Sequence, residues 1–234
     1  MAGPDEPGYT SLYPFLYDTS TDTAAATAAA DDEILDSSVS KIREIMALRQ
    51  RVAAQDAQRL AACATAMAKR FAAGGRLLAF GNGGSSTDAQ DLTRLFMWPG
   101  PTRTALPALA LTNDVAAVTA LTNDVGFDVA FARQIGAFGR PGDIVVGLST
   151  SGNSTNLLHA FDQAKRTGML TVGLAGYDGG KMAGLATIDH LFVVPSPSVH
   201  RVQEAQTTIY HVLWELTVDA YSGADLPARS GAAS

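Results

Sequence analysis

Two short segments rich in glycine and hydroxyl side chains could bind an anion. The first, Gly81–Ser86, reads GNGGSS, and the second, Ser149–Ser154, reads STSGNS. Each follows a short apolar run and precedes a helical pattern. Glycine lets the backbone approach a ligand closely, and the free N–H groups at the start of a helix favour an anion. Hydroxyls beside such a helix suit a phosphate monoester without a lysine, although serine and glycine are also common in ordinary loops and caps.

A dinucleotide is the alternative ligand for the first segment. Its fingerprint needs a third glycine and an acidic residue roughly 20 positions further on. Here Ser86 stands at the third glycine position, and residues 99–109 contain no Asp or Glu. The sequence also lacks a Gly-Lys-Ser/Thr phosphate-binding motif. These departures argue against nicotinamide-dependent chemistry and against nucleotide hydrolysis.

The elements that must position these segments alternate between strand and helix. Five short apolar runs, each beside a Gly, Ser or Pro break, are separated by helical patterns. The runs are Arg76–Phe80, Ala108–Thr112, Asp143–Ser149, Leu170–Ala175 and His190–Pro195. Such alternation predicts an α/β fold with a parallel, helix-covered sheet. Both hydroxyl-rich segments then follow strands at the carboxyl edge of the sheet, where open α/β folds bind their ligands.

Helical apolar spacing also precedes and follows the sheet. Residues 31–73 are expected to form two helices that break near residues 48–56, and Gly74 and Gly75 supply the stop. A last helix is expected over Val199–Tyr221. The predicted boundaries are a flexible N-terminal extension over 1–30, one domain over 31–222 and a disordered tail over 223–234.

Two local features complete this organisation. An aromatic and aliphatic cluster within residues 9–17 is expected to dock on the domain or on a neighbouring subunit. The hexapeptide ALTNDV occurs twice, at Ala110–Val115 and Ala120–Val125, without a third copy. Two copies ten residues apart do not support a solenoid.

Composition excludes several functional classes. The 234 residues include 17 Lys and Arg against 23 Asp and Glu, a formal net charge of −6, which excludes a strongly basic nucleic-acid-binding protein. No apolar run approaches the roughly 18 residues of a membrane span, and the N-terminus lacks the regions of a signal peptide. The single cysteine, Cys63, rules out an intramolecular disulfide. We expect a cytoplasmic protein with neither nucleic-acid nor membrane partners.

The ordered set of motifs resembles a known family. GNGGSS, DAQ, TNDVGFD, LSTSGNS, GYDGGKMAG and RVQE with a downstream histidine follow one another as in the sugar isomerase (SIS) domain, over roughly residues 31–222. More narrowly, the sequence is similar to the phosphoheptose isomerases, which interconvert sedoheptulose 7-phosphate and a heptose 7-phosphate. The resemblance implies a five-stranded parallel sheet with helices on both faces. It also implies a homotetramer with active sites between subunits.

The resemblance also implies roles for residues of this chain. The phosphate-binding residues it implies are Ser149, Thr150, Ser151 and Ser154. The sugar-binding residues it implies are Asn82, Gly83, Ser85, Asn123, Asp124 and Gln203.

The proton-transfer positions depart from the family pattern. Isomerisation through an enediol needs a base near C1 and C2 of the sugar. The family glutamate for this task corresponds to Leu95, the histidine one turn earlier to Asp91, and an arginine one turn later to Pro99, which should end the helix early. Leucine cannot move a proton. The remaining candidates for catalysis are His211, which matches the family's catalytic histidine, together with Asp91, Asp124 and Glu204.

The same positions bear on metal binding. At about 100° per residue, His200, Gln203, Glu204 and His211 fall within a third of the last helix's circumference. Some family members hold zinc through a His, a Glu, this Gln and this His. In this sequence Gln203 and His211 are kept, and Asp91 could serve as a third ligand through a carboxylate oxygen. No close His/Cys spacing supports a metal independently, so we predict no cofactor, with zinc as the alternative.

Two functions remain open at this point. The first is an aldose–ketose isomerase whose base has moved to one of the remaining carboxylates. The second is a catalytically silent phosphosugar-binding protein with a regulatory or assembly role, similar to the replication-initiator-associating SIS proteins. Two roles also remain open for His211, which could be catalytic or could be a core histidine beside Tyr210 and Trp214. Both functions require a phosphorylated sugar as ligand.

Overall fold

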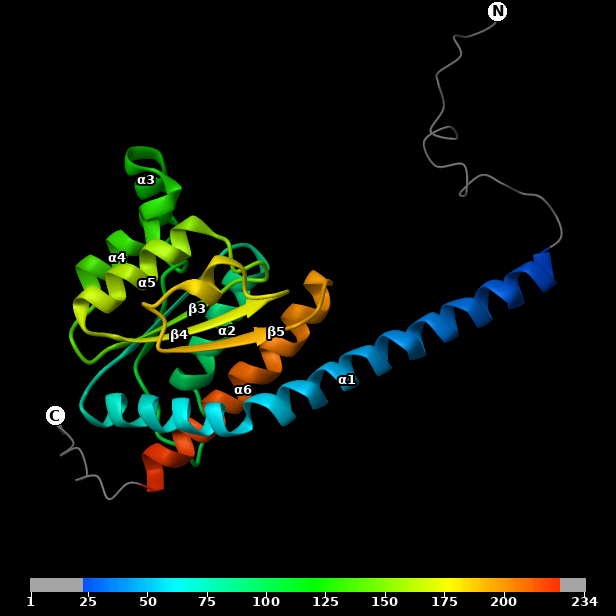
Figure 1. Ribbon diagram of the computed structural model, residues 1–234, viewed down its shortest axis with the longest axis horizontal. Coiled ribbons are helices and arrows are strands. Elements are labelled where there is room, and N and C mark those ends of the chain that lie inside the picture. Colours follow the sequence, from blue (N-terminus) through cyan, green and yellow to red (C-terminus); the bar gives the residue numbers. More distant parts are fainter. Residues whose placement is uncertain (1–22, 224–234) are drawn as a thin grey trace, which may run out of the picture. The chain divides into compact units, whose positions relative to one another are not determined.

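The computed structural model describes residues 23–223. The extension is expected over 1–30 and the tail over 223–234; residues 1–22, with the aromatic cluster, and 224–234 lie outside the described residues, whereas residues 23–30 are helical and not a flexible extension. The helices are α1 (Thr23–Ala72), α2 (Gly84–Met97), α3 (Val115–Val125), α4 (Ala130–Phe138), α5 (Thr155–Thr167) and α6 (Val199–Gly223) (Figure 1). The strands are β1 (Leu77–Gly81), β2 (Ala108–Ala110), β3 (Ile144–Leu148), β4 (Leu170–Gly176) and β5 (His190–Val194). Short 3₁₀ turns form η2 (Phe127–Val129) and η3 (Gly180–Gly184).

The five strands form one parallel sheet in the order β2-β1-β3-β4-β5. This confirms the predicted fold class, and four of the five strands lie within one residue of their expected bounds at each end. The edge strand β2 ends at Ala110 rather than Thr112, because the Asn113 amide donates to the Ala110 carbonyl in a turn. Since all strands run the same way, the loops after β1 and β3 leave the same edge of the sheet.

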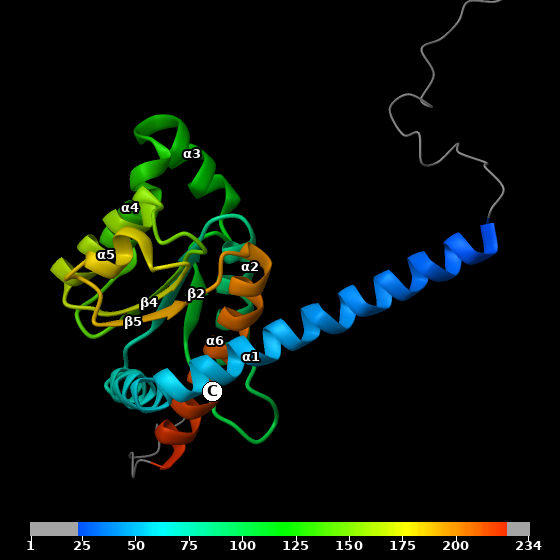
Figure 2. The ribbon, with the colours of Figure 1, turned by 45° about the vertical axis from the view of Figure 1, so that its right-hand side comes forward.

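Each face of the sheet carries its own hydrophobic core. Strand side chains alternate between faces, so Leu77 and Ala79 of β1 contribute to one cluster while Leu78 and Phe80 contribute to the other. The first cluster includes side chains of α2, α6 and the C-terminal part of α1, and the second includes side chains of α4 and α5. Figure 2 shows these helices on opposite sides of the strands.

The predicted break near residues 48–56 is wrong, because α1 is a single helix of 50 residues. Its apolar stripe continues through Leu48, Val52 and Leu60 at four-residue spacing, but Asp56 occupies the core-facing position between them. The Asp56 carboxylate pairs with Arg59, whose guanidinium also donates to the Leu191 carbonyl. The interruption in the hydrophobic pattern is therefore a paired carboxylate and not a turn. Tertiary contacts divide the chain at residue 44, and the described residues of the first part, 23–44, are helical.

The end of α2 follows the sequence prediction. The helix ends at Met97, and Trp98 leaves the helical conformation immediately before Pro99. The helix begins at Gly84, so the first glycine-rich loop runs directly into it. Within residues 23–223, no helix combines the length and apolar character needed to cross a membrane.

Candidate functional site

The two hydroxyl-rich loops are joined by a reciprocal pair of hydrogen bonds. Asn82 Nδ2 donates to Asn156 Oδ1 at 3.0 Å, and Asn156 Nδ2 donates to Asn82 Oδ1 at 2.9 Å. Asn82 follows β1, whereas Asn156 lies in the first turn of α5 and is 2% exposed. The pair satisfies the buried Asn156 amide and the partly buried Asn82 amide at once, and it holds both loops at one edge of the sheet.

The loop after β3 has a fixed backbone. Ser149 is buried, and its Oγ accepts a hydrogen bond from the Gly152 amide at 3.0 Å. Gly152 has φ +67°, and a Cβ there would collide with the Gly179 carbonyl. The Met182 amide donates to the Gly152 carbonyl at 3.0 Å. The GYDGGKMAG segment therefore packs against the loop. The close approach of the two backbones explains why Gly152 and Gly179 face each other.

The remaining hydroxyls of this loop differ in their partners. Ser151 Oγ accepts a hydrogen bond from the Asn153 amide at 3.2 Å. Thr150 and Ser154 are partly exposed, and their hydroxyls make no hydrogen bond to any of the described residues. Ser154 is the N-cap of α5 but its side chain does not cap the helix. The loop thus presents uncommitted donors beside the N-terminus of a 13-residue helix, an arrangement that suits a phosphate.

Helix α6 contacts both loops. Gln206 is buried, and its Nε2 donates to the Ser149 carbonyl at 3.0 Å. Gln203, one turn earlier, lies so close to Gly84 that a Cβ at that glycine would collide with the Gln203 amide. Gly84, the last glycine of GNGGSS, therefore makes room for Gln203 of α6.

Asp91 of α2 and His211 of α6 lie close together, about two turns of α6 beyond Gln203. Asp91 Oδ2 lies 3.6 Å from His211 Nε2 and accepts a hydrogen bond from the Tyr210 hydroxyl at 3.0 Å, while Oδ1 pairs with Arg94 at 2.5 Å. Burial raises the pKa of Asp91, but the hydrogen bonds from Arg94 and Tyr210 outweigh burial and hold the pKa below its usual value. Asp91 is therefore an ionised, well-anchored carboxylate. His211 stacks on Tyr210 with its side chain 42% exposed, so it is not a core histidine.

Asp88 is a second carboxyl of this cluster that the sequence reasoning missed. Burial, and then repulsion from Asp91, raise its pKa to about 6, although a hydrogen bond from Gln203 works in the opposite direction. Its Oδ2 is buried without a hydrogen-bond partner among the described residues. An acid that titrates near neutral pH inside a ligand site is a candidate for proton transfer. Its spacing of three residues before Asp91 on one helix is the signal that could have found it.

Three predicted site residues lie elsewhere. Asn123 and Asp124 are exposed near the end of α3, where Asn123 Nδ2 donates to Asp124 Oδ1 at 2.9 Å. Glu204 is exposed on α6 and pairs with Arg201. No described contact links these three side chains to the two loops. Gly83 and Ser85 do lie in the first loop, with Gly83 exposed at φ +54° and Ser85 buried.

The donors near His211 are engaged by other side chains of the described chain. Leu95 is 8% exposed and packs in the hydrophobic cluster, so it offers neither a base nor a metal ligand. The Asp91 carboxylate is already paired with the Arg94 guanidinium, which places a positive charge where a cation would bind. Gln203 faces Asp88 instead. No group of three His, Cys, Asp or Glu in the described part of the chain is arranged to hold a metal, and we route no chemical step through zinc.

The fold and the two joined loops define an α/β domain built to hold a small anionic ligand at the carboxyl edge of its sheet. The model of the SIS domain matches residues 42–176. Phosphoheptose isomerase of Pelodictyon phaeoclathratiforme is 48% identical over 172 residues, covering 72% of this chain and 81% of that protein. The corresponding protein of Desulfovibrio desulfuricans is 46% identical, with 80% and 89% covered. The chain belongs to the SIS family, and within it to the phosphoheptose isomerase type.

Solved structures agree with this assignment. The phosphoheptose isomerase of Neisseria gonorrhoeae matches with a TM-score of 0.73 and 34% identity, covering 79% of this chain and 98% of that chain. The phosphoheptose isomerase of Francisella tularensis matches with a TM-score of 0.74 and 32% identity, over 79% and 98% of the two chains.

Proposed function

We propose that the chain binds a sugar phosphate of the heptose 7-phosphate class. The observation that carries the proposal is the reciprocal Asn82–Asn156 pair, which holds a hydroxyl-rich loop and a glycine-rich loop together at one edge of the sheet. In a parallel sheet this edge is the usual place of a ligand. The similarity to proteins named phosphoheptose isomerase supports the same class of ligand.

The phosphate is assigned to the loop after β3. Thr150, Ser151 and Ser154 supply hydroxyl donors and the start of α5 supplies backbone N–H groups, while Ser149 shapes the loop through its bond from Gly152. No lysine or arginine belongs to this loop, so recognition depends on hydrogen bonds to neutral donors.

The sugar is assigned to the space beside the loop after β1. Asn82, Gly83 and Ser85 belong to that loop, and Gln203 approaches it from α6. Gln203 lies beside Asp88 of α2, so both α2 and α6 contribute polar groups near this loop.

We further propose that the site is completed by a neighbouring copy in a homotetramer. Asn123 and Asp124 are exposed on α3 and contact none of the other site residues of the described chain. Their polar side chains would be available to a second copy. Sedimentation velocity of the purified protein tests the assembly, and a monomer at micromolar concentration would contradict it. Because Cys63 is the single cysteine and is buried, we propose a cytoplasmic location.

Aldose–ketose isomerisation is a second candidate function, favoured by Asp88. A carboxyl with a pKa of about 6 can both accept and return a proton near neutral pH. Asp91 and His211 lie one turn further along the same helix pair. Buried Leu95 in place of the family base favours the silent, phosphosugar-binding alternative.

Binding is tested by calorimetry with sedoheptulose 7-phosphate and, in parallel, the unphosphorylated sugar. We expect binding only of the phosphate ester and its loss in a Ser151→Ala/Ser154→Ala double variant. Ser222→Ala, at an exposed position near the end of α6, is the matched control. Unchanged affinity in the double variant would contradict the phosphate assignment.

Turnover is tested separately. The purified protein is incubated with sedoheptulose 7-phosphate in deuterated water, and exchange of the C1 and C2 protons is followed by NMR. Exchange that disappears in Asp88→Asn supports the isomerase. Absent exchange with intact binding leaves the silent phosphosugar-binding function.

A further inference from the structure

Tyr177 is the one non-glycine residue of the described chain with a positive φ. It lies in the turn after β4 and has φ +55°. The Gly179 amide closes this turn by donating to the Gly176 carbonyl at 2.8 Å, so Tyr177 is its second residue. Turns with a positive φ at this position normally take Gly, Asn or Asp, because a larger side chain is strained there. Gly179 and Gly180 of the same segment also have a positive φ, and only Tyr177 bears a side chain in that conformation.

The turn is interlocked with the loop after β3. A Cβ at Gly176 would collide with the Thr150 carbonyl, and a Cβ at Gly180 would collide with the Ser151 carbonyl. The two backbones are therefore in direct contact on both sides of Tyr177, and the turn cannot shift towards the loop to relieve the strain. Because consecutive Cα atoms are about 3.8 Å apart, Tyr177 lies beside the loop to which the phosphate is assigned.

No contact of the Tyr177 side chain within the described residues compensates for this strain. Its ring takes part in no aromatic pair or cation–π contact there, and its hydroxyl makes no hydrogen bond to a described residue. The residue is partly exposed, and its hydroxyl is not among the buried polar atoms that lack a partner, so the hydroxyl reaches solvent. A phenolic O–H is a neutral donor that can serve a ligand. Strained residues of this kind are typical of functional sites.

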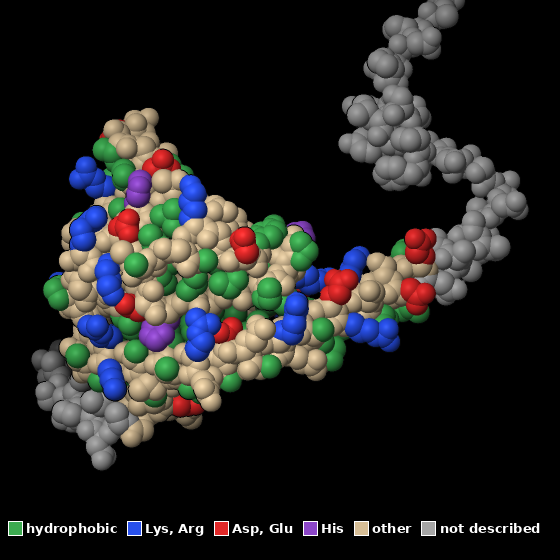
Figure 3. Space-filling view, in the orientation of Figure 1, with side chains coloured by type: hydrophobic (Ala, Val, Ile, Leu, Met, Phe, Trp, Pro, Cys, Tyr) green, Lys and Arg blue, Asp and Glu red, His purple; other side chains and the backbone are tan. Residues whose placement is uncertain are grey.

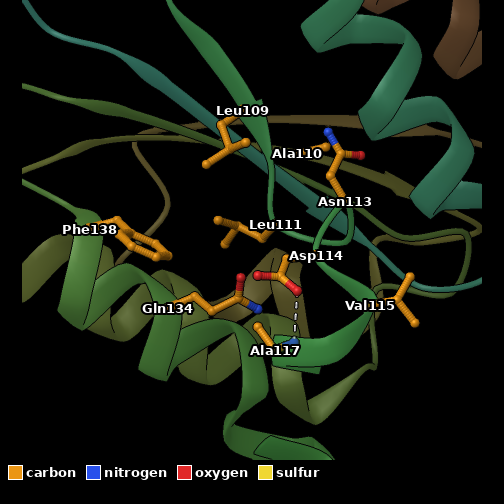
Figure 4. A pocket seen from close by; sticks show the side chains of 9 residues that line it. All are labelled: Leu109, Ala110, Leu111, Asn113, Asp114, Val115, Ala117, Gln134 and Phe138. Carbon is orange, nitrogen blue, oxygen red and sulfur yellow. Dashed lines mark hydrogen bonds between the residues drawn. The ribbon is translucent and has the colours of Figure 1, made fainter. Parts of the chain in front are cut away.

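Other parts of the surface lack a comparable signal. The hollow of about 520 Å³ beside β2 is lined mainly by apolar side chains (Figure 4), and no buried, unpartnered polar atom of the described residues lines it. Asp114, its one charged side chain, is exposed to solvent. On the face drawn in Figure 3, Lys and Arg side chains are interspersed with Asp and Glu. The strained tyrosine instead belongs to the carboxyl edge, where β3 and β4 end side by side.

We propose that Tyr177 is a further ligand-binding residue, whose hydroxyl donates a hydrogen bond to the phosphate group held by the loop after β3. The inference rests on the phosphosugar binding proposed above. That loop contains no Lys or Arg, so recognition of the phosphate depends on the number of neutral donors around it. Tyr177 adds a donor from a third loop of the same edge, and this hydrogen bond offsets the strain of its backbone.

Tyr177→Phe keeps the ring and the turn and removes only the hydroxyl. Calorimetry of the full-length protein with sedoheptulose 7-phosphate should give an affinity about tenfold or more below that of the wild type, as expected for a lost hydrogen bond to a charged group. The melting temperature without ligand should not change. Tyr221→Phe, at a partly exposed tyrosine near the end of α6, is the matched control and should bind as the wild type does.

Tyr177→Gly separates the side chain from the conformation of the turn, because glycine adopts the same φ without strain. It should weaken binding at least as much as Tyr177→Phe does. Inorganic phosphate alone is the probe for the contacted group, and its affinity should fall by a similar factor in Tyr177→Phe. An unchanged affinity for inorganic phosphate in this variant would overturn the assignment of the hydroxyl to the phosphate.

The Ser151→Ala/Ser154→Ala double variant is measured beside these proteins. If it loses binding while both Tyr177 variants keep wild-type affinity, the inference about Tyr177 is overturned and the phosphate assignment stands. If the wild-type protein does not bind sedoheptulose 7-phosphate, the proposed function fails and the inference fails with it.

Discussion

The side chains of Asn82 and Asn156 exchange two hydrogen bonds across 74 positions of the sequence. One amide belongs to the loop after β1 and the other to the first turn of α5, so the pair ties together two βα units. Asn156 is buried and Asn82 is partly buried.

Asn156→Ala should lower the free energy of unfolding by about 1–3 kcal/mol, because it leaves the Asn82 amide without its partner. Urea denaturation of Asn82→Ala, Asn156→Ala and the double variant measures the effect. The double variant should cost less than the sum of the two single variants. Additive costs would show that the two loops are not coupled through this pair.

Gly152→Ala should disrupt the phosphate loop. A Cβ at φ +67° is strained and would collide with the Gly179 carbonyl, so we expect a loss of about 2 kcal/mol or more in stability together with loss of phosphosugar binding. Gly184→Ala is the matched control, since a Cβ there meets nothing within 4 Å. Thermal unfolding and calorimetry measure the two effects, and wild-type affinity in Gly152→Ala would contradict the loop geometry.

Asp88 should make stability depend on pH in the acid range. Its pKa is raised from 3.8 to about 6 in the folded protein, so between these values the folded state binds more protons than the unfolded state. The contribution of Asp88 to stability is therefore fully present below pH 3.8 and is lost as the pH rises through about 6. Relative to Asp88→Asn, the wild-type protein should lose stability across that window and change no further above it. Urea denaturation at several pH values measures the difference in free energy of unfolding between the two proteins. A difference that does not change with pH would contradict the raised pKa.

Leu95→Glu places a carboxylate at the position that the resemblance to the family assigns to its base. The side chain is 8% exposed within the hydrophobic cluster, so we expect a lower melting temperature. We also expect exchange of the sugar C1 and C2 protons in deuterated water to rise above that of the wild-type protein. Leu95→Gln, which has the same size without a base, should not show the increase. Equal exchange in both variants would show that the site lacks more than this one group.

The sequence predicted the sheet well because its strands are short apolar runs bounded by glycine, serine or proline, a local pattern. The two ligand loops could be placed for the same reason, since parallel strands bring their carboxyl ends to one edge. Continuity of α1 could not be predicted, because the apolar gap at Asp56 looks like a turn until its partner Arg59 is known.

The acid cluster was only partly predictable. Asp91 and His211 were paired through a resemblance, and the structure places them 3.6 Å apart. Asp88 was missed because its pKa depends on burial by α6, which is more than a hundred residues away in the chain. Gln206 was missed because a buried glutamine that bonds to a distant carbonyl has no local signature.

Helix α6 contacts both the two loops and the acid cluster around Asp91. Gln203, Gln206 and Tyr210 follow one another at intervals of three and four residues, and they contact Gly84, the Ser149 carbonyl and Asp91 respectively. The pitch of one helix thus fixes the distance from the phosphate loop to the acid cluster. One extra residue after Thr207 would leave both glutamines in place and rotate Tyr210 by about 100° away from Asp91. A one-residue insertion between Gln206 and Tyr210 is therefore incompatible with the contacts that α6 makes to both halves of the site.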